Sequence, residues 1–320
     1  MKRFWSMLIF VLLLVTVAQG AEQAEVPSLH YIIPAKAGGG FEHSSRTMSD
    51  SWSELLGNPI EFSFEPGMSG GIGFGKLMAR PADGYTVLMT EISMHAMHIN
   101  MGVVLDGWQN IGFIGNLITD PNVLLVNIDS PYKTLQDFIE AGKKAATPLK
   151  ISTSQPESIS TLAAKIFIKE TGINAEVVAY RGGSESRAIL AAKKADASIG
   201  PYFSASPMKD KIKALASFTQ KKVYAGVWDI PTVNEVTGKD LPEIMSPYAV
   251  MVKKATATQS PERYQQLVKT FKAATQSAKT RAIADKTGMT PFIDYWSPEQ
   301  CEAYVKNFQG LWNKYKGLMR

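Results

Sequence analysis

The residues best suited to chemistry in this chain lie in two loops that carry neighbouring glycines. One loop holds Gly38, Gly39 and Gly40 after a short apolar run, and the other holds Gly182 and Gly183. Glycine leaves backbone N–H groups accessible, and N–H groups at the start of a helix bind anions. The two loops therefore indicate an anion site, although glycines alone do not say which anion is bound.

Two further loops add hydroxyl and amide groups in the same sequence context. Ser69 and Gly70 lie in the loop at 66–71, and Ser154, Gln155 and Ser158 lie in the run at 152–160. Each loop taken alone is also explained by helix capping, which uses the same residue types. All four loops follow expected strands, two in each expected lobe, and their convergence is what a ligand crevice requires.

Two enzyme motifs match in part and fail on their partners. Residues 70–76 fit the first seven positions of a phosphate-binding loop, but Leu77 stands where Ser or Thr would hold magnesium. Residues 67–71 fit the G-x-S-x-G pattern of a serine hydrolase with Ser69 as nucleophile. The histidines that follow it, His95 and His98, come too early in the chain, and the acid between them and Ser69, Asp83, lies in an expected turn. Catalysis is therefore not expected.

A cluster of histidine and methionine spans residues 94–101. Two histidines three residues apart can share one helix face, and thioethers suit soft metals such as Cu(I). No carboxylate or thiol joins them at close spacing, so packing is the expected role and no metal or cofactor is predicted. The members of this cluster are Met94, His95, Met97, His98 and Met101.

The start of the chain has the composition of a cleaved export signal. Lys2 and Arg3 precede an apolar run at 7–17 that is too short to span a bilayer comfortably, and Ala18 and Gly20 suit a cleavage site. Cleavage after Gly20 removes two cations and no acid, so the formal charge falls from +5 to +3. No basic cluster accompanies this charge, which argues against a nucleic-acid surface. We expect an exported protein.

The order of apolar runs predicts an α/β protein. Expected strands at 29–33, 60–64 and 85–89 alternate with helical patterns at 41–56 and 71–78, and a second alternation follows at 123–201. Short connections in this order imply a mostly parallel sheet flanked by helices. A mature chain of about 300 residues exceeds what one core usually serves, so two lobes are expected. Cys301 lies in a helical series of apolar residues and is expected to be a buried thiol.

Six stretches in order over nearly the whole mature sequence carry a resemblance to a known family. They are Ile-Pro-Ala-Lys-Ala-Gly-Gly-Gly at 33–40, Leu-Leu-Gly-Asn-Pro-Ile at 55–60, Glu-Pro-Gly-Met-Ser-Gly-Gly-Ile-Gly at 65–73, Pro-Ala-Asp-Gly-Tyr-Thr-Val-Leu at 81–88, Asn-Val-Leu-Leu-Val-Asn at 122–127 and Val-Ala-Tyr-Arg-Gly-Gly at 178–183. The chain resembles the periplasmic substrate-binding proteins of the tripartite tricarboxylate transporter family, also called Bug receptors. Any one glycine cluster is a weak signal, whereas the ordered set is specific.

Three departures from the family pattern bear on the ligand. The family usually has Asp two residues past the triple glycine, where this chain has Glu42. Its middle loop, usually glycine-rich and ending in a histidine, reads Ser-Gln-Pro-Glu-Ser-Ile-Ser-Thr at 154–161 here. The segment at 91–101 carries His and Met where the family often has Ser, Thr and Asn. The departures leave the expected fold intact and the ligand unnamed.

The resemblance implies a two-lobed periplasmic binding protein of type II-like fold, in which each lobe is a mostly parallel sheet flanked by helices. Lobe 1 is expected to comprise residues 25–124 plus 229–320, and lobe 2 residues 125–228. The strands that cross between lobes near 124–127 and 223–228 are expected to act as a hinge.

The same resemblance implies a receptor that holds a small organic acid and delivers it to transporter subunits in the membrane. No nucleic-acid partner is expected, and the protein is expected to be a monomer. The two alternatives are a receptor that feeds a sensor and an exported hydrolase that uses Ser69. The expected ligand-binding residues are Gly38, Gly39, Gly40, Glu42, Ser69, Gly70, Thr90, Ser154, Gln155, Ser158, Tyr180, Arg181, Gly182, Gly183 and Tyr202.

Two charged residues in these loops have competing explanations. Glu42 either improves the electrostatics of the helix start or accepts hydrogen bonds from a hydroxyl or amine of the ligand. Arg181 is the candidate counter-charge for a carboxylate, and a solvent-facing role is its alternative.

Overall fold

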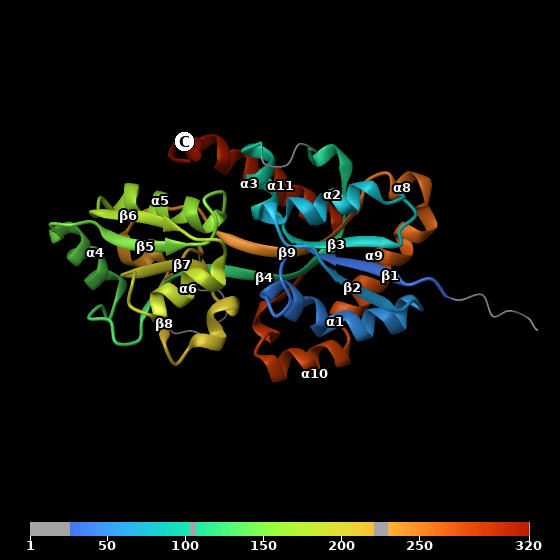
Figure 1. Cartoon of the computed structure of the whole chain (residues 1–320), viewed down its shortest axis with the longest axis horizontal. Coiled ribbons are helices and arrows are strands. Elements are labelled where there is room, and N and C mark those ends of the chain that lie inside the picture. The colour runs from blue at the N-terminus through green and yellow to red at the C-terminus, as the bar shows by residue number, and fades with distance from the viewer. Residues whose placement is uncertain (1–25, 103–106, 221–229, 320) are drawn as a thin grey trace, which may run out of the picture.

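The computed structural model describes residues 26–102, 107–220 and 230–319, and Figure 1 shows two α/β halves joined by crossing strands. The first half contains the expected β-α-β-α-β unit at the N-terminal end of the chain. Its strands pair in parallel in the order β2-β1-β3. Its elements are β1 (Leu29–Ile33), α1 (Gly40–Leu56), β2 (Ile60–Phe64), η1 (Met68–Gly70), α2 (Gly71–Ala79), β3 (Thr86–Glu91) and α3 (Ile92–Asn100).

The second half repeats the alternation with its own parallel strands. β5 pairs in parallel with β6 on one side and β7 on the other. The elements of this half are α4 (Leu135–Lys144), β5 (Leu149–Thr153), α5 (Ile159–Thr171), β6 (Ala175–Ala179), α6 (Gly183–Ala191), β7 (Ala197–Pro201), η3 (Phe203–Met208), β8 (Ile212–Ser217) and α7 (Val233–Thr237).

The C-terminal part of the chain returns to the first half. Its elements are β9 (Met245–Lys253), α8 (Thr256–Gln259), α9 (Pro261–Thr275), α10 (Ala278–Thr287), η4 (Thr290–Phe292), β10 (Ile293–Trp296), α11 (Pro298–Tyr315) and η5 (Lys316–Leu318). β9 lies antiparallel between β3 and the long strand β4, so the first half has a mixed sheet with a parallel core.

One long strand, β4 (Ile111–Asn127), belongs to both halves, and η2 (Trp108–Asn110) leads into it. Residues 111–121 of β4 pair with β9, and residues 122–127 pair with β7 and β8. The sequence predicted only the last five residues of this strand, because Gly112, Gly115 and Pro121 interrupt the pattern upstream. Register shifts against β9 lie on either side of Gly115, and Gly112 and Pro121 still pair with β9.

The return crossing runs from about residue 241 into β9, where Asn122 N donates to Ile244 O at 3.1 Å. The second hinge expected at 223–228 lies outside the described residues. Val233 of α7 and Leu241 pack in the core of the second half, together with Phe138 and Phe167. The lobe limits stay a prediction, and this packing argues for ending lobe 2 near residue 244.

Helix α11 connects the two cores. Cys301 near its start is fully buried in the first half, which confirms the predicted buried thiol, and burial raises its pKa. Phe308, Trp312 and Tyr315 further along pack in the core of the second half. Figure 1 shows the red C-terminal end of α11 reaching over that half. The lobes are therefore joined by a packed helix as well as by crossing strands.

Candidate functional site

The glycine loop of the first half bends so that Glu42 closes it. Gly38 has φ +82°, a left-handed conformation that favours glycine, and Gly39 is the N-cap of α1. Gly38 N donates to Glu42 Oε2 at 2.6 Å, and Arg46 Nε donates to Glu42 Oε1 at 2.6 Å. The hydrogen bond from Gly38, followed by that from Arg46, lowers the pKa of Glu42. The helix-start role of Glu42 is thus seen directly, and its contact with a ligand stays a prediction.

The glycine loop of the second half has the same arrangement. Gly182 is the N-cap of α6, and Arg181 N donates to Glu185 Oε2 at 3.1 Å. The Arg181 side chain is exposed. A different arginine reaches the helix start: Arg187 Nη1 lies 2.9 Å from where a methyl group on Gly183 would sit. Side chains on a helix lean toward its N-terminus, which explains how a residue in the second turn gets there.

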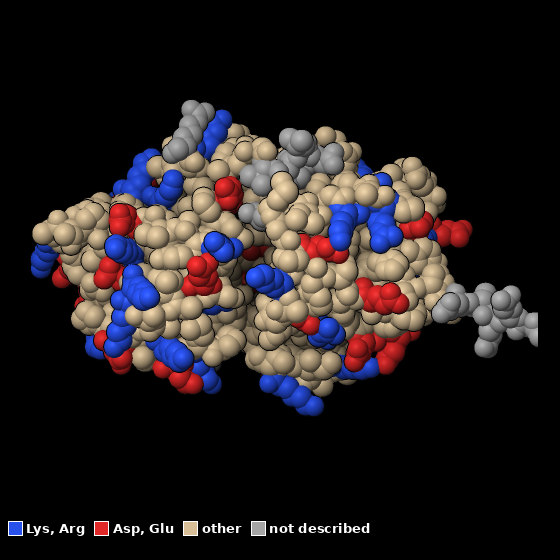
Figure 2. All heavy atoms as spheres, viewed as in Figure 1, with Lys and Arg blue, Asp and Glu red and all other residues tan. Residues whose placement is uncertain are grey.

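The two halves approach each other between these loops. A methyl group on Gly40 would lie 3.0 Å from Ser204 Oγ of η3 and 3.8 Å from the Tyr248 hydroxyl of β9. Ser204 Oγ and the Tyr248 hydroxyl are themselves 3.4 Å apart. Figure 2 shows a groove between the halves on the face viewed. The glycine loop of α1 therefore meets the second half at η3.

The crossing strand supplies a buried acid beneath this contact. Asp120 is fully buried, and its carboxylate accepts from Phe203 N at 2.9 Å and from Ser204 N at 3.3 Å. Burial raises the pKa of Asp120 to about 7, although these hydrogen bonds act in the opposite direction. Asp120 thus holds the start of η3 on β4.

A second buried acid, Glu91, ends β3 in the same region. Its carboxylate accepts from Ser93 Oγ at 2.6 Å, and burial raises its pKa to about 7. A neighbouring chain of polar groups crosses between the halves, because Ser160 Oγ donates to Asn122 Oδ1 at 2.8 Å and Asn122 Nδ2 donates to Ser246 Oγ at 3.0 Å. The space between the lobes therefore has a polar floor.

The structure brings some expected site residues together. Tyr180 N donates to Ser154 O at 2.8 Å, so the loops after β5 and β6 lie side by side. Gln155 O accepts from Thr161 Oγ1, and the Ser158 hydroxyl caps α5 by accepting from Thr161 N at 3.2 Å. These loops are therefore well ordered by internal hydrogen bonds, and their contacts with a ligand stay a prediction.

Other expected residues are placed less favourably. Thr90 lies within β3 with an exposed fraction of 3%. Tyr202 is the N-cap of η3, with its ring 6.1 Å from that of Phe292 in the first half. The backbone of Ser69 and Gly70 forms η1, and a methyl group on Gly70 would lie 3.5 Å from Pro34 Cβ.

Five residues of this region were not predicted from the sequence, namely Glu91, Asp120, Arg187, Ser204 and Tyr248. Asp120 stands directly before a proline, and Arg187 is spaced as an ordinary helix residue. A signal existed only for Ser204, in the polar stretch that follows β7.

The histidines of α3 are packed in the protein interior. The His95 ring lies 4.6 Å from that of Phe74 and 5.3 Å from that of Trp108, and His98 is also buried. Burial lowers the pKa of His95 to about 3 and that of His98 to about 4. Across residues 26–102, 107–220 and 230–319, no group of three or more His, Cys, Asp and Glu side chains could hold a metal ion. The expected packing role fits these contacts.

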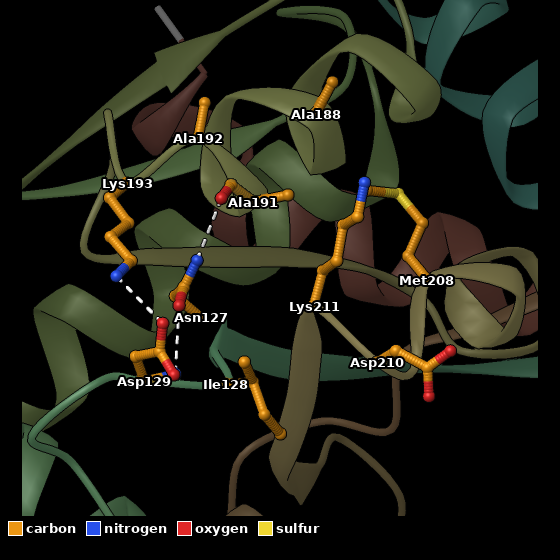
Figure 3. Close-up of a pocket in the computed structure, with 10 residues that line it drawn as sticks. All are labelled: Asn127, Ile128, Asp129, Ala188, Ala191, Ala192, Lys193, Met208, Asp210 and Lys211. Carbon is orange, nitrogen blue, oxygen red and sulfur yellow. Dashed lines mark hydrogen bonds and ion pairs between the residues drawn. The ribbon is translucent and has the colours of Figure 1, made fainter.

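A surface hollow of about 510 Å³ lies at the C-terminal end of α6, away from its glycine loop (Figure 3). Lys193 Nζ pairs with Asp129 Oδ2 at 2.9 Å beside it, and Asn127 Nδ2 donates to Ala191 O at 3.0 Å. None of the expected ligand-binding residues lines this hollow. Its lining residues are Asn127, Ile128, Asp129, Ala188, Ala191, Ala192, Lys193, Met208, Asp210 and Lys211.

Comparisons with known proteins agree on one family. The model of the tripartite tricarboxylate transporter family receptor (TctC) matches residues 44–312. A UPF0065 protein of Cupriavidus necator is 26% identical over 267 residues, which cover 82% of this chain and 79% of that protein.

Solved structures agree on the fold. R. palustris Rpa4515 with adipate has a TM-score of 0.79 at 23% identity and covers 92% of this chain and 97% of its own. The periplasmic binding protein BugD has a TM-score of 0.76 at 22% identity, and the match covers 92% of this chain and 98% of BugD. Within the described residues, no helix is both long and apolar enough to cross a bilayer.

Proposed function

This chain belongs to the tripartite tricarboxylate transporter receptor family, and from that premise we propose that it captures a small organic acid between its two lobes and delivers it to a membrane transporter. Receptors of this family are periplasmic solute-binding proteins. We extend this to the present chain by proposing export, with cleavage after Gly20, and release into the space outside the cytoplasmic membrane.

The observation that carries the proposal is that the glycine-led start of α1 lies against the second half, which carries a glycine-led helix start of its own. α1 begins at Gly40 and α6 at Gly183, and a methyl group on Gly40 would lie 3.0 Å from Ser204 Oγ of the second half. Each helix start favours an anion by about 0.3–1 kcal/mol when exposed, and by more when water is excluded. Lobe closure would exclude water and enclose the acid.

The expected site residues other than Arg181, whose side chain is exposed, are proposed in this light as the walls of one cavity. The backbone N–H groups of the two glycine loops and the hydroxyls of the loops after β2 and β5 would supply hydrogen-bond donors. Rpa4515, which shares this fold, was solved with adipate, and this supports an organic acid as the ligand class here.

A thermal-shift screen against organic acids tests the proposal. An acid that binds the folded protein stabilises it, by about 2.7 kcal/mol at a hundredfold over its dissociation constant. Small-angle scattering with that acid should show compaction, because closure brings the lobes together. Failure of every organic acid to raise the melting temperature would contradict the proposed function.

A further inference from the structure

The two helix starts differ in what their nearest arginine does. In the first half, Arg46 Nε donates to Glu42 Oε1 at 2.6 Å and so neutralises the acid that closes the loop. In the second half, Arg187 has no carboxylate within ion-pair distance among the residues that the structure describes. Arg187 Nη2 donates a long hydrogen bond to Ser184 Oγ, at 3.5 Å. Arg187 thus brings a positive charge to the start of α6 without a salt bridge to any described acid, and the acid that acts on it electrostatically, Asp120, lies beyond ion-pair distance.

Arg187 also stands close to the contact between the lobes. Burial lowers the pKa of its guanidinium, and Tyr248 and Asp120 are the titratable groups that act on it in the opposite direction. Tyr248 is the residue whose hydroxyl lies beside Ser204 and Gly40. An arginine remains protonated at any physiological pH, and its planar fork of donors matches a carboxylate.

The opposite side of the groove is unsuited to a second carboxylate. The Gly38 N–H, which a carboxylate on that side would need, already donates to Glu42 at 2.6 Å. Glu42 stays ionised, because the hydrogen bonds from Gly38 and Arg46 lower its pKa. A carboxylate at this end of the ligand would have to displace Glu42 from the Gly38 N–H, whereas an uncharged donor could bond to Glu42 in place.

We propose that Arg187 binds the carboxylate of the ligand, and that the ligand is a monocarboxylate whose other end, near Glu42, is uncharged and can donate a hydrogen bond. This inference rests on the proposed function. It assigns the counter-charge to Arg187 in place of Arg181, whose side chain is exposed.

Calorimetry with matched pairs of acids tests the inference. Each pair consists of a dicarboxylate and the hydroxy acid of equal length, such as adipate with 6-hydroxyhexanoate. The series includes shorter and longer aliphatic pairs, and one aromatic pair, terephthalate with 4-(hydroxymethyl)benzoate. In the pair that binds best, the hydroxy acid should bind at least about tenfold more tightly than the dicarboxylate. Arg187→Gln should weaken that binding by at least about tenfold, because a charge-assisted bidentate contact is lost.

Two variants serve as controls for the arginine. Arg181→Gln removes an exposed cation on the same loop and should change the affinity by less than about twofold. Gly183→Ala keeps Arg187 but pushes its flexible guanidinium aside, and it should also weaken binding while the melting temperature is unchanged. Gly183→Ala keeps the test valid if Arg187→Gln fails to fold.

The outcomes separate this inference from the proposed function. Tighter binding of the dicarboxylates, or unchanged affinity in both Arg187→Gln and Gly183→Ala, would overturn the monocarboxylate assignment and leave the receptor function intact. If no acid of either kind binds the unaltered protein, the proposed function fails and the inference fails with it.

Discussion

The starts of α1 and α6 share one capping geometry but differ in how the nearest arginine is paired. Gly39-Gly40-Phe41-Glu42 and Gly182-Gly183-Ser184-Glu185 each place a glutamate in the third helical position, from which it accepts a backbone N–H just before the helix. The capping geometry is shared, but Arg46 forms a salt bridge with Glu42, while Arg187 forms none with the described acids. We expect a glycine loop to bind an anion only where a cation outweighs its own capping acid.

The largest expected effects test whether the halves that carry these loops fold as one unit. Phe271 is fully buried in the first core and Phe167 in the second. Phe271→Ala and Phe167→Ala should each lower the free energy of unfolding by about 3–5 kcal/mol, because each leaves a cavity. Since α11 packs on both cores, denaturant unfolding should remain a single transition in both variants.

Lys169→Ala, on the exposed side of α5, is the matched control and should change stability by less than about 0.5 kcal/mol. Two separated transitions, with only one moved by each core variant, would show that the lobes unfold independently.

The second prediction compares how Glu91, buried between the lobes, and Glu42, in the glycine loop, change stability with pH. Burial raises the folded-state pKa of Glu91 to about 7, whereas hydrogen bonds lower that of Glu42. Between the unfolded value near 4.5 and about 7, the folded protein holds a proton on Glu91 that the unfolded chain has lost. Native Glu91 therefore costs stability as pH rises through this window, by up to about 1.4 kcal/mol per pH unit.

Glu91→Gln should accordingly gain stability relative to the unaltered protein as pH rises from 4.5 to 7, with a constant difference above 7. Urea titrations of both proteins across this range measure the difference directly. The same experiment with Glu42→Gln, extended below pH 4.5, should show the opposite sign: the variant should lose stability relative to the unaltered protein as pH rises toward 4.5, with a constant difference above it. If the stability difference from the unaltered protein changed with pH in the same way for both variants, the contrast between Glu91 and Glu42 would be wrong.

The third prediction concerns the contact between the loop of α1 and the second half. Gly40→Ala places a methyl group 3.0 Å from Ser204 Oγ, and we expect this crowding to hinder closure of the lobes. Affinity for the best organic acid should fall by about tenfold, equal to about 1.4 kcal/mol. Adding Ser204→Ala removes the crowded oxygen and should restore most of the loss. An additive effect of the two changes would mean that Gly40 does not limit closure.

The smallest effects compare the two capping glutamates themselves. Glu42→Gln should cost about 1 kcal/mol of stability, because its hydrogen bond with Gly38 weakens and its pairing with Arg46 is lost. Glu185→Gln, with a longer hydrogen bond to Arg181 and no described arginine partner, should cost about 0.5 kcal/mol. Thermal melts of both variants measure which one loses more stability, and a larger loss for Glu185→Gln would contradict the prediction.

The sequence predicted the α/β fold, the family and the glycine loops because each depends on local patterns. Triple glycine after an apolar run is enough to place Gly38 before a helix. It could not predict that Gly38 N donates to Glu42, because a folded-back side chain depends on the loop conformation. Arg187 was missed for the same reason, since its spacing resembles that of any exposed helix residue. Asp120 was missed because burial on a crossing strand is set by tertiary structure.

The central claim concerns where the carboxylate of the ligand lies, and a crystal structure with the most stabilising organic acid tests it most directly. We predict the acid enclosed between the lobes, with its carboxylate within hydrogen-bond distance of Arg187 and the start of α6, and with Glu42 still bonded to Gly38. A carboxylate seated on Gly38 with Glu42 displaced, or an acid bound in the hollow at the far end of α6, would contradict the account.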